Sequence, residues 1–163
     1  MRFYLIDRII VLSIGQSIEG IKCVTKSEDF LEQHFPGYPV MPGVLIIESM
    51  AQLSGYLLSK TKEAKGQYIF AILSMVEKAK FYKMVSPGEQ MKIISKIENE
   101  NDESAIVKTQ AFVEGERVAE AKMMFIFFPI EGETESAKRN IMSGMFAGIE
   151  NKINPFKRKS EYV

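Results

Sequence analysis

Residues 33–59, QHFPGYPVMPGVLIIESMAQLSGYLLS, decide how this chain folds. The first part, residues 34–43, contains three prolines and two glycines in ten positions. Proline fixes φ and removes a backbone donor, so this part is predicted to be a stiff, irregular loop rather than helix or central strand. Pro42 is a favoured residue for the first turn of a helix. Ten apolar residues between Val44 and Leu58 then cover nearly the whole helical circumference, which is typical of a buried helix.

Polar residues interrupt this apolar pattern at a few positions. His34 is the only histidine in the chain, and Glu48 lies inside the apolar helix. The side of the helix that carries Glu48 also carries the residues four, seven and eleven positions beyond it, Gln52, Gly55 and Ser59. A buried carboxylate is costly unless it is paired or protonated. Taken alone, the spacing leaves open whether Glu48 points to water or acts chemically, and whether His34 is structural or catalytic.

Length and composition exclude several classes of protein. At 163 residues with zero formal net charge, the chain is expected to form one globular domain. Its single cysteine, Cys23, cannot form an internal disulfide, and with one histidine it predicts no metal site. We therefore expect a cytoplasmic protein. The sequence shows no signal peptide, no apolar run of the ~18 residues that a membrane span needs and no nucleic-acid motif.

Segments on both sides of the helix are rich in β-branched and aromatic residues and are predicted to be strands. These segments are residues 3–14, 17–25, 68–75, 77–85, 90–98, 105–113 and 117–128. Turn signals separate several of them, and Gly20 predicts a β-bulge in the second. Residues 60–66 are predicted to be a charged exit from the helix that ends at a glycine. The pattern favours an α+β domain in which a curved antiparallel sheet wraps around one long buried helix.

The C-terminal part of the chain has a different character. Residues 138–163 carry six basic and two acidic side chains, a net charge of +4. Apolar residues recur there at helical spacing: Ile141, Met142, Met145, Phe146, Ile149 and Ile153. A short basic amphipathic helix is predicted, starting near residues 134–136 and limited by Pro155. Three interpretations stay open: a helix that docks on its own oligomer, a disordered tail, or a surface for an acidic carrier protein or an anionic membrane.

The motif H-F-P-G-x-P-x-M-P-G-V-L-I-I-E-x-x-A-Q, residues 34–52, resembles the signature of the FabZ-type 3-hydroxyacyl-(acyl-carrier-protein) dehydratases of type II fatty acid synthesis. The resemblance covers roughly residues 2–131 and includes FYLIDRI at residues 3–9 and KFYKMVSPGEQM at residues 80–91. It implies a hotdog fold for residues 1–131, with residues 132–163 as an extension. It also implies that acyl carrier protein is the partner and that no cofactor is needed. The resemblance further implies a homodimer whose sheets join edge to edge, either alone or assembled into a trimer of dimers.

The predicted chemistry fits the residue types in the motif. Removal of water from a 3-hydroxyacyl thioester needs a base for the C2 proton and an acid for the C3 hydroxyl. It also needs a donor to the thioester oxygen, where charge develops. Neutral imidazole suits the first task, and a carboxylic acid kept protonated by apolar surroundings suits the second. A backbone N–H at the start of a helix suits the third, because it has no partner inside the helix.

The resemblance assigns these tasks to particular residues. His34 matches the catalytic histidine and Glu48 the catalytic carboxylate. The N–H of Gly43 matches the group that binds the thioester carbonyl, and the carbonyl of Val40 matches the one that holds the histidine ring. Gln52 is expected to support Glu48. In the family, the histidine and the glutamate of one site come from opposite subunits, and glutamate rather than aspartate marks the branch that does not isomerise the double bond.

Some residues depart from the family pattern. Gln33 stands where glycine is usual, and residues 82–84, Tyr-Lys-Met, stand where Arg-Arg-Pro is usual, which bears on the loop geometry and the carrier contact. Two alternatives therefore stay beside the dehydratase: an acyl thioesterase on the same fold, and a non-catalytic subunit that binds an acyl carrier.

Overall fold

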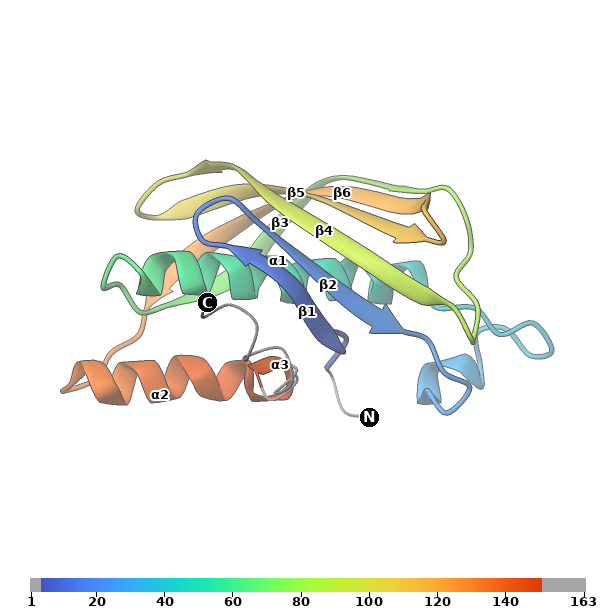
Figure 1. The fold of residues 1–163 in the computed structure, drawn as a ribbon, viewed down its shortest axis with the longest axis horizontal. Helices are drawn as coiled ribbons and strands as arrows, with labels where there is room; N and C mark the ends of the chain where they lie inside the picture. The colour runs from blue at the N-terminus through green and yellow to red at the C-terminus, as the bar shows by residue number, and fades with distance from the viewer. Residues whose placement is uncertain (1–3, 151–163) are drawn as a thin grey trace, which may run out of the picture.

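The computed structural model describes residues 4–150. These residues form a six-stranded antiparallel sheet that curves around one long helix (Figure 1). The strands are β1 Arg8–Ser13, β2 Ser17–Cys23, β3 Ile69–Phe81, β4 Gln90–Glu100, β5 Ser104–Val113 and β6 Glu116–Pro129. The helices are η1 Asp29–Leu31, α1 Gly43–Glu63, α2 Glu135–Met145 and α3 Ala147–Glu150. The order across the sheet is β1-β2-β4-β5-β6-β3, so β1 and β3 are the edge strands. This architecture confirms the predicted α+β class.

The central helix α1 fills the concave side of the sheet, as predicted (Figure 1). Its apolar residues from Ile46 onward are largely buried, and Met50, Leu53 and Leu57 are fully enclosed. The first turn differs from the prediction of a helix buried all round. Val44 is 75% exposed there. Burial depends on where the sheet ends and not on helical periodicity, so the sequence pattern alone could not separate this turn from the rest.

The C-terminal end of α1 leads into the predicted charged exit, in which Gly66 has a φ of +74°. The helix continues to Glu63, and Lys62 is only 2% exposed. Its ammonium group lies 2.8 Å from a carboxylate oxygen of Glu100 and donates to the carbonyl of Asn101 at 2.8 Å. The hairpin between β4 and β5 therefore supplies the partners that allow this charge to be buried.

Gly20 allows the sheet to approach α1 closely. A Cβ atom at this position would lie 2.8 Å from Cδ1 of Leu53 on α1 and 3.2 Å from the carbonyl oxygen of Arg8. The bulge predicted at Gly20 is on the neighbouring strand, where the register between β1 and β2 shifts between Ile9 and Val11. The prediction was wrong because a glycine within a strand marks close backbone approach as well as a bulge.

The bounds of β3 differ from the predicted strand bounds. Residues 68–75 and 77–85, predicted as two strands, contain one continuous strand that pairs with β6 along its length. The register shifts between Leu73 and Met75 and again between Val76 and Lys78, so irregularities bend the strand without breaking it. At the other edge, β1 begins at Arg8 rather than near residue 3.

The C-terminal helices pack on the side of α1 that faces away from the sheet (Figure 1). Helix α2 starts where predicted, and the side chain of Thr134 caps it by accepting from the N–H of Ala137 at 3.1 Å. Met142, Phe146 and Ile149 join the hydrophobic core of the domain. Packing on the core of the same chain was not among the three interpretations of this segment, and docking on an oligomer stays a prediction. Ile153, Pro155 and most of the basic residues lie outside the described residues.

No helix within residues 4–150 could cross a membrane. Each helix there is too short or too polar to span a bilayer.

Candidate active site

The proline-containing loop before α1 folds back on itself at His34. The N–H of Val40 donates to the carbonyl of His34 at 2.9 Å, and Phe35 and Tyr38 exchange two further backbone hydrogen bonds at 3.1 and 2.9 Å. Gly37, with φ +80°, makes the reversal possible. The peptide bond between His34 and Phe35 is cis. The loop is therefore fixed by its own backbone contacts, which places the imidazole on a rigid support.

The imidazole of His34 is held through one of its two nitrogen atoms. Nδ1 lies 3.1 Å from the carbonyl oxygen of Val40, and the ring of Phe35 stacks on the imidazole at 4.2 Å between centroids. Because a carbonyl oxygen can only accept, Nδ1 carries the proton in this contact. Nε2 of the neutral ring is then the nitrogen with a free lone pair. This tautomer is the one that can take a proton from a substrate.

The start of α1 offers backbone donors beside this loop. The helix begins at Gly43, directly after Pro42, and the first N–H groups of a helix have no partner inside it. The ring of Phe81, at the end of β3, covers Gly43 so closely that a Cβ atom there would lie 3.0 Å from the ring. Phe81 also lines an open hollow of about 500 Å³ together with Tyr38, Tyr82, Lys83, Met84 and Ser86. This end of α1 is thus accessible and lined mainly by aromatic and apolar side chains.

Glu48 is half-buried on the second turn of α1 and has a neutral partner. The amide nitrogen of Gln52 donates to a carboxylate oxygen of Glu48 at 3.0 Å. The amide oxygen of Gln52 accepts from the backbone N–H of Leu5 at 2.9 Å. The two contacts fix which way the amide of Gln52 faces, because only its NH₂ group can donate and only its oxygen can accept. Gln52 therefore bridges the N–H of Leu5 and the carboxylate of Glu48.

The polar side of α1 continues toward the edge strand. Gly55 faces β3, since a Cβ atom there would lie 3.8 Å from the carbonyl oxygen of Ala71. Ser59 is fully buried, and its hydroxyl has no hydrogen-bond partner among residues 4–150. Of the positions on the stripe predicted from spacing, Gly55 therefore lies beside β3, whereas Gln52 contacts the segment before β1.

The structure does not join the two side chains that the sequence predicts to react. Within residues 4–150 of a single chain, no hydrogen bond or ion pair links His34 to Glu48. The N–H of Leu5 and the ring of Phe81 belong to the site as well, and sequence reasoning missed both. A backbone donor leaves no signal in residue type, and the approach of Phe81 to Gly43 depends on how β3 crosses the helix.

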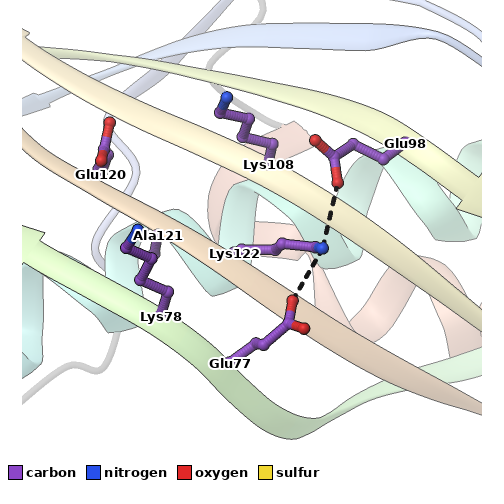
Figure 2. Close-up of a pocket in the computed structure, with 7 residues that line it drawn as sticks. All are labelled: Glu77, Lys78, Glu98, Lys108, Glu120, Ala121 and Lys122. Atoms are coloured by element: carbon purple, nitrogen blue, oxygen red, sulfur yellow. Dashed lines mark ion pairs between the residues drawn. The ribbon is translucent and has the colours of Figure 1, made fainter.

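A second hollow lies on the outer face of the sheet, away from the loop and the start of α1 (Figure 2). It is lined by Glu77, Lys78, Glu98, Lys108, Glu120, Ala121 and Lys122. The ammonium group of Lys122 lies 2.9 Å from Glu77 and 3.8 Å from Glu98, and its hydrogen bond to Glu77 raises the pKa of Lys122. Exposed pairs of this kind across strands stabilise a sheet only slightly. None of the predicted site residues lines this hollow.

The described part of the chain contains no group of side chains that could form a metal site. Among residues 4–150, no three histidine, cysteine, aspartate or glutamate side chains are grouped as ligands.

Comparison with known proteins defines the class of this chain. A family model described as a FabA-like domain matches residues 1–122, about three quarters of the chain. The chain belongs to the FabA-like family. A solved structure of smu.793 from Streptococcus mutans, bound to acetyl CoA, has a TM-score of 0.60 at 15% identity and covers 77% of this chain and 90% of that chain. This likeness concerns the fold alone, and together with the sheet and helix it confirms the predicted hotdog fold.

Curated relatives give a narrower comparison. A protein of Listeria welshimeri named 3-hydroxyacyl-(acyl-carrier-protein) dehydratase FabZ is 39% identical over 123 residues, which are 76% of this chain and 84% of the relative. A protein of Caldicellulosiruptor saccharolyticus with the same name is 41% identical over 123 residues, 76% of this chain and 86% of the relative. The aligned part accounts for most of both relatives, so the extension at the C-terminus of this chain lies mainly outside the similarity.

Proposed function

We propose that this protein converts (3R)-3-hydroxyacyl-(acyl-carrier-protein) to trans-2-enoyl-(acyl-carrier-protein) in type II fatty acid synthesis. Membership of the FabA-like family and relatives named as this dehydratase at about 40% identity support the proposal. The observation that carries it is the state of His34. Its Nδ1–H is bound to Val40, which leaves Nε2 free to act as a base.

His34 and Glu48 divide the proton transfers between them. Nε2 of His34 takes the proton from C2, and the electron pair of that C–H bond forms the C2=C3 double bond as the C3–O bond breaks. Glu48, protonated, gives its proton to the departing hydroxyl, which leaves as water. The N–H of Gly43 donates to the thioester oxygen, where negative charge develops during the reaction. Proton return from His34 to Glu48 then restores the enzyme.

A homodimer would complete the site. β3 is an edge strand, and its free side exposes Ile72, Met75 and Val76 at 47%, 46% and 40%. An exposed apolar edge is a liability for a single chain, and pairing with β3 of a second copy would cover it. Gly55, seven residues after Glu48 on α1, lies beside this strand. We therefore propose that His34 works with Glu48 of the partner subunit, in a dimer that exists alone or in a trimer of dimers.

The substrate would arrive on the phosphopantetheine arm of acyl carrier protein, in the cytoplasm. The hollow beside Phe81 suits entry of the arm, since Phe81 covers Gly43. The reaction as written needs no oxidant, metal or other cofactor, because fixed donors polarise the thioester.

The test is hydration of a short trans-2-enoyl thioester, the reverse reaction, followed by loss of ultraviolet absorbance. We expect turnover by the wild type and a fall of about 100-fold or more in His34→Ala and in Glu48→Gln, the scale of a lost acid or base. Glu98→Gln, in the hollow on the outer face and on β4, is the matched control and should keep full activity. Release of thiol with the double bond intact would identify a thioesterase instead, and inertness toward carrier-bound substrates would contradict catalysis.

A further inference from the structure

We propose that the C-terminal extension, α2 and α3, is a positioning element for the active site. It holds the N-terminal residues Tyr4 and Leu5 in the place from which Leu5 orients Gln52, and through Gln52 the carboxylate of Glu48. The inference rests on the proposed role of Glu48. It assigns a function to a segment that lies beyond residues 1–122, the part that the family model matches.

The extension is anchored next to Gln52 on α1. Phe146 is buried and packs edge to face on Tyr56 with the ring centroids 5.2 Å apart. Tyr56 follows Gln52 by one helical turn, so this contact lies directly beyond the glutamine. At the far end of α2, Arg139 donates to the hydroxyl of Tyr68 at 3.0 Å and pairs with Glu63 at 3.2 Å. Contacts at both ends therefore fix the extension along α1.

A second contact lies on the other side of Gln52. Gly148 of α3 faces the ring of Tyr4, and a Cβ atom on Gly148 would come within 2.7 Å of Cγ and Cδ1 of that ring. These ring atoms are close to the backbone, so a side chain at position 148 must displace either Tyr4 or α3. The absence of a side chain lets α3 and the N-terminal segment lie in direct contact.

Tyr4 leads directly to the site. Leu5 is 1% exposed, and its N–H donates to the amide oxygen of Gln52. Residues 4–7 precede β1 and have no regular secondary structure. Asp7 is tied to β2, because its N–H donates to the carbonyl of Ile21 at 2.7 Å and its carboxylate accepts from the N–H of Cys23 at 2.6 Å. The position of Tyr4, further from the strand, depends more on side-chain packing.

The line of contact thus runs from Gly148 to Tyr4, to the N–H of Leu5, to Gln52 and to Glu48. A shift of Tyr4 would weaken the hydrogen bond from the N–H of Leu5 to Gln52. The amide group of Gln52 would then be less firmly held in the orientation in which it donates to Glu48.

Two matched glycines in the extension provide the experiment. Gly148→Ala adds a Cβ against Tyr4, whereas Gly144→Ala, in α2, adds one where nothing lies within 4 Å. The first readout, hydrogen exchange of the Leu5 amide by NMR, does not involve activity. We expect exchange at Leu5 to become about tenfold faster in Gly148→Ala and to stay unchanged in Gly144→Ala, while the amides in the middle of α1 keep their protection.

The second readout is kcat for the hydration reaction, measured on the full chain below its unfolding temperature. Misplacement of a reacting group by a fraction of an ångström lowers the rate, so we expect kcat to fall about 5- to 10-fold in Gly148→Ala. Tyr4→Ala should show the same loss of kcat. Tyr4→Phe, which keeps the ring, should have the wild-type kcat. In a Gln52→Ala background, Gly148→Ala should cause no further loss, because the effect passes through Gln52.

The outcomes separate this inference from the proposed function. Unchanged Leu5 exchange and kcat in both Gly148→Ala and Tyr4→Ala would overturn the positioning role, even if the unfolding temperature falls. Full additivity with Gln52→Ala would overturn the route through Gln52. If the wild type has no dehydratase activity, the proposed function fails, while the exchange of Leu5 still shows whether the extension holds the N-terminal segment.

Discussion

Lys62 shows how a single residue can be buried with its charge. Its ammonium group is enclosed at the end of α1, next to Glu100, the carbonyl of Asn101 and the ring of Phe127, whose centroid lies 4.8 Å away. Partial burial raises the pKa of Glu100, but hydrogen bonds and charge from Lys62 and Lys65 outweigh it and hold that pKa below its ordinary value of 4.5. The carboxyl of Glu100 is therefore ionised in the folded protein at neutral pH, and removal of it would leave the ammonium group of Lys62 buried without this partner.

A pH-dependent loss of stability follows from this pair. The carboxyl of Glu100 has a lower pKa folded than unfolded, so its contribution is present above pH 4.5 and is lost as the pH falls through the folded pKa. We expect Glu100→Gln to lower the free energy of unfolding by about 3 kcal/mol at pH 7, since it leaves Lys62 buried without a counter-charge. Urea denaturation at pH 7, 5 and 3.5 should show the difference from wild type shrinking at the lowest pH.

Glu103→Gln is the control for that series, because Glu103 is exposed on the same hairpin. Its effect should stay within about 0.5 kcal/mol, as for most surface substitutions. A difference between wild type and Glu100→Gln that stays constant from pH 7 to pH 3.5 would contradict the assignment.

At the scale of elements, the contact between α1 and the sheet sets the shape of the domain. Gly20 on β2 leaves room for Leu53, and α1 approaches the strand without an intervening side chain. Deeper in the same interface, the hydroxyls of Ser54, Ser95 and Thr109 bond to one another at 3.0 to 3.2 Å and join α1 to β4 and β5. The helix is thus fixed by close approach at one strand and by a satisfied polar cluster at two others.

Two glycine substitutions should have opposite effects on this interface. Gly20→Ala places a methyl group 2.8 Å from Leu53, and we expect overpacking to lower the free energy of unfolding by about 1–3 kcal/mol. Gly55→Ala, within α1, meets only the carbonyl of Ala71 at 3.8 Å, so better helix propensity should raise stability by up to about 1 kcal/mol. Chemical denaturation measures both, and equal effects of the two substitutions would show that the close approach at Gly20 is not tight.

At the scale of the whole molecule, the exposed edge of β3 and the separate positions of His34 and Glu48 point to the same arrangement. A single chain presents each reactive side chain without a contact between them. If two copies share their sites, each variant of one side chain is inactive alone, but a mixed dimer retains one site with both native residues.

Mixing two inactive variants tests the shared site. Co-refolded His34→Ala and Glu48→Gln, in equal amounts, should regain about a quarter of the wild-type activity, because half of the dimers are mixed and each of these has one intact site. Each variant co-refolded with itself is the control and should remain inactive. Measurements of size and mass must show that mixed dimers have formed. If they have formed and activity is not regained, each site lies within one chain.

Much of the molecule could be predicted from local patterns. The periodicity of residues 44–58 predicted α1, the prolines and glycines of residues 34–43 predicted the fixed loop, and β-prone segments predicted the strands. The spacing of Glu48 and Gln52 predicted their common face, because a helix repeats every 3.6 residues whatever surrounds it. These features are short-range, so the residue types along the chain specify them.

Other features depended on contacts between distant parts of the chain. The hydrogen bond from Leu5 to Gln52 joins residues 47 positions apart, and Arg139 reaches Tyr68 across 71 positions. No local pattern marks such a partner, since the donor at Leu5 is a backbone N–H that nearly every residue has. By itself, the sequence determined the helix, the loop and the candidate residues. Only the tertiary structure decided which groups hold those residues, because packing brings together segments whose patterns are independent of one another.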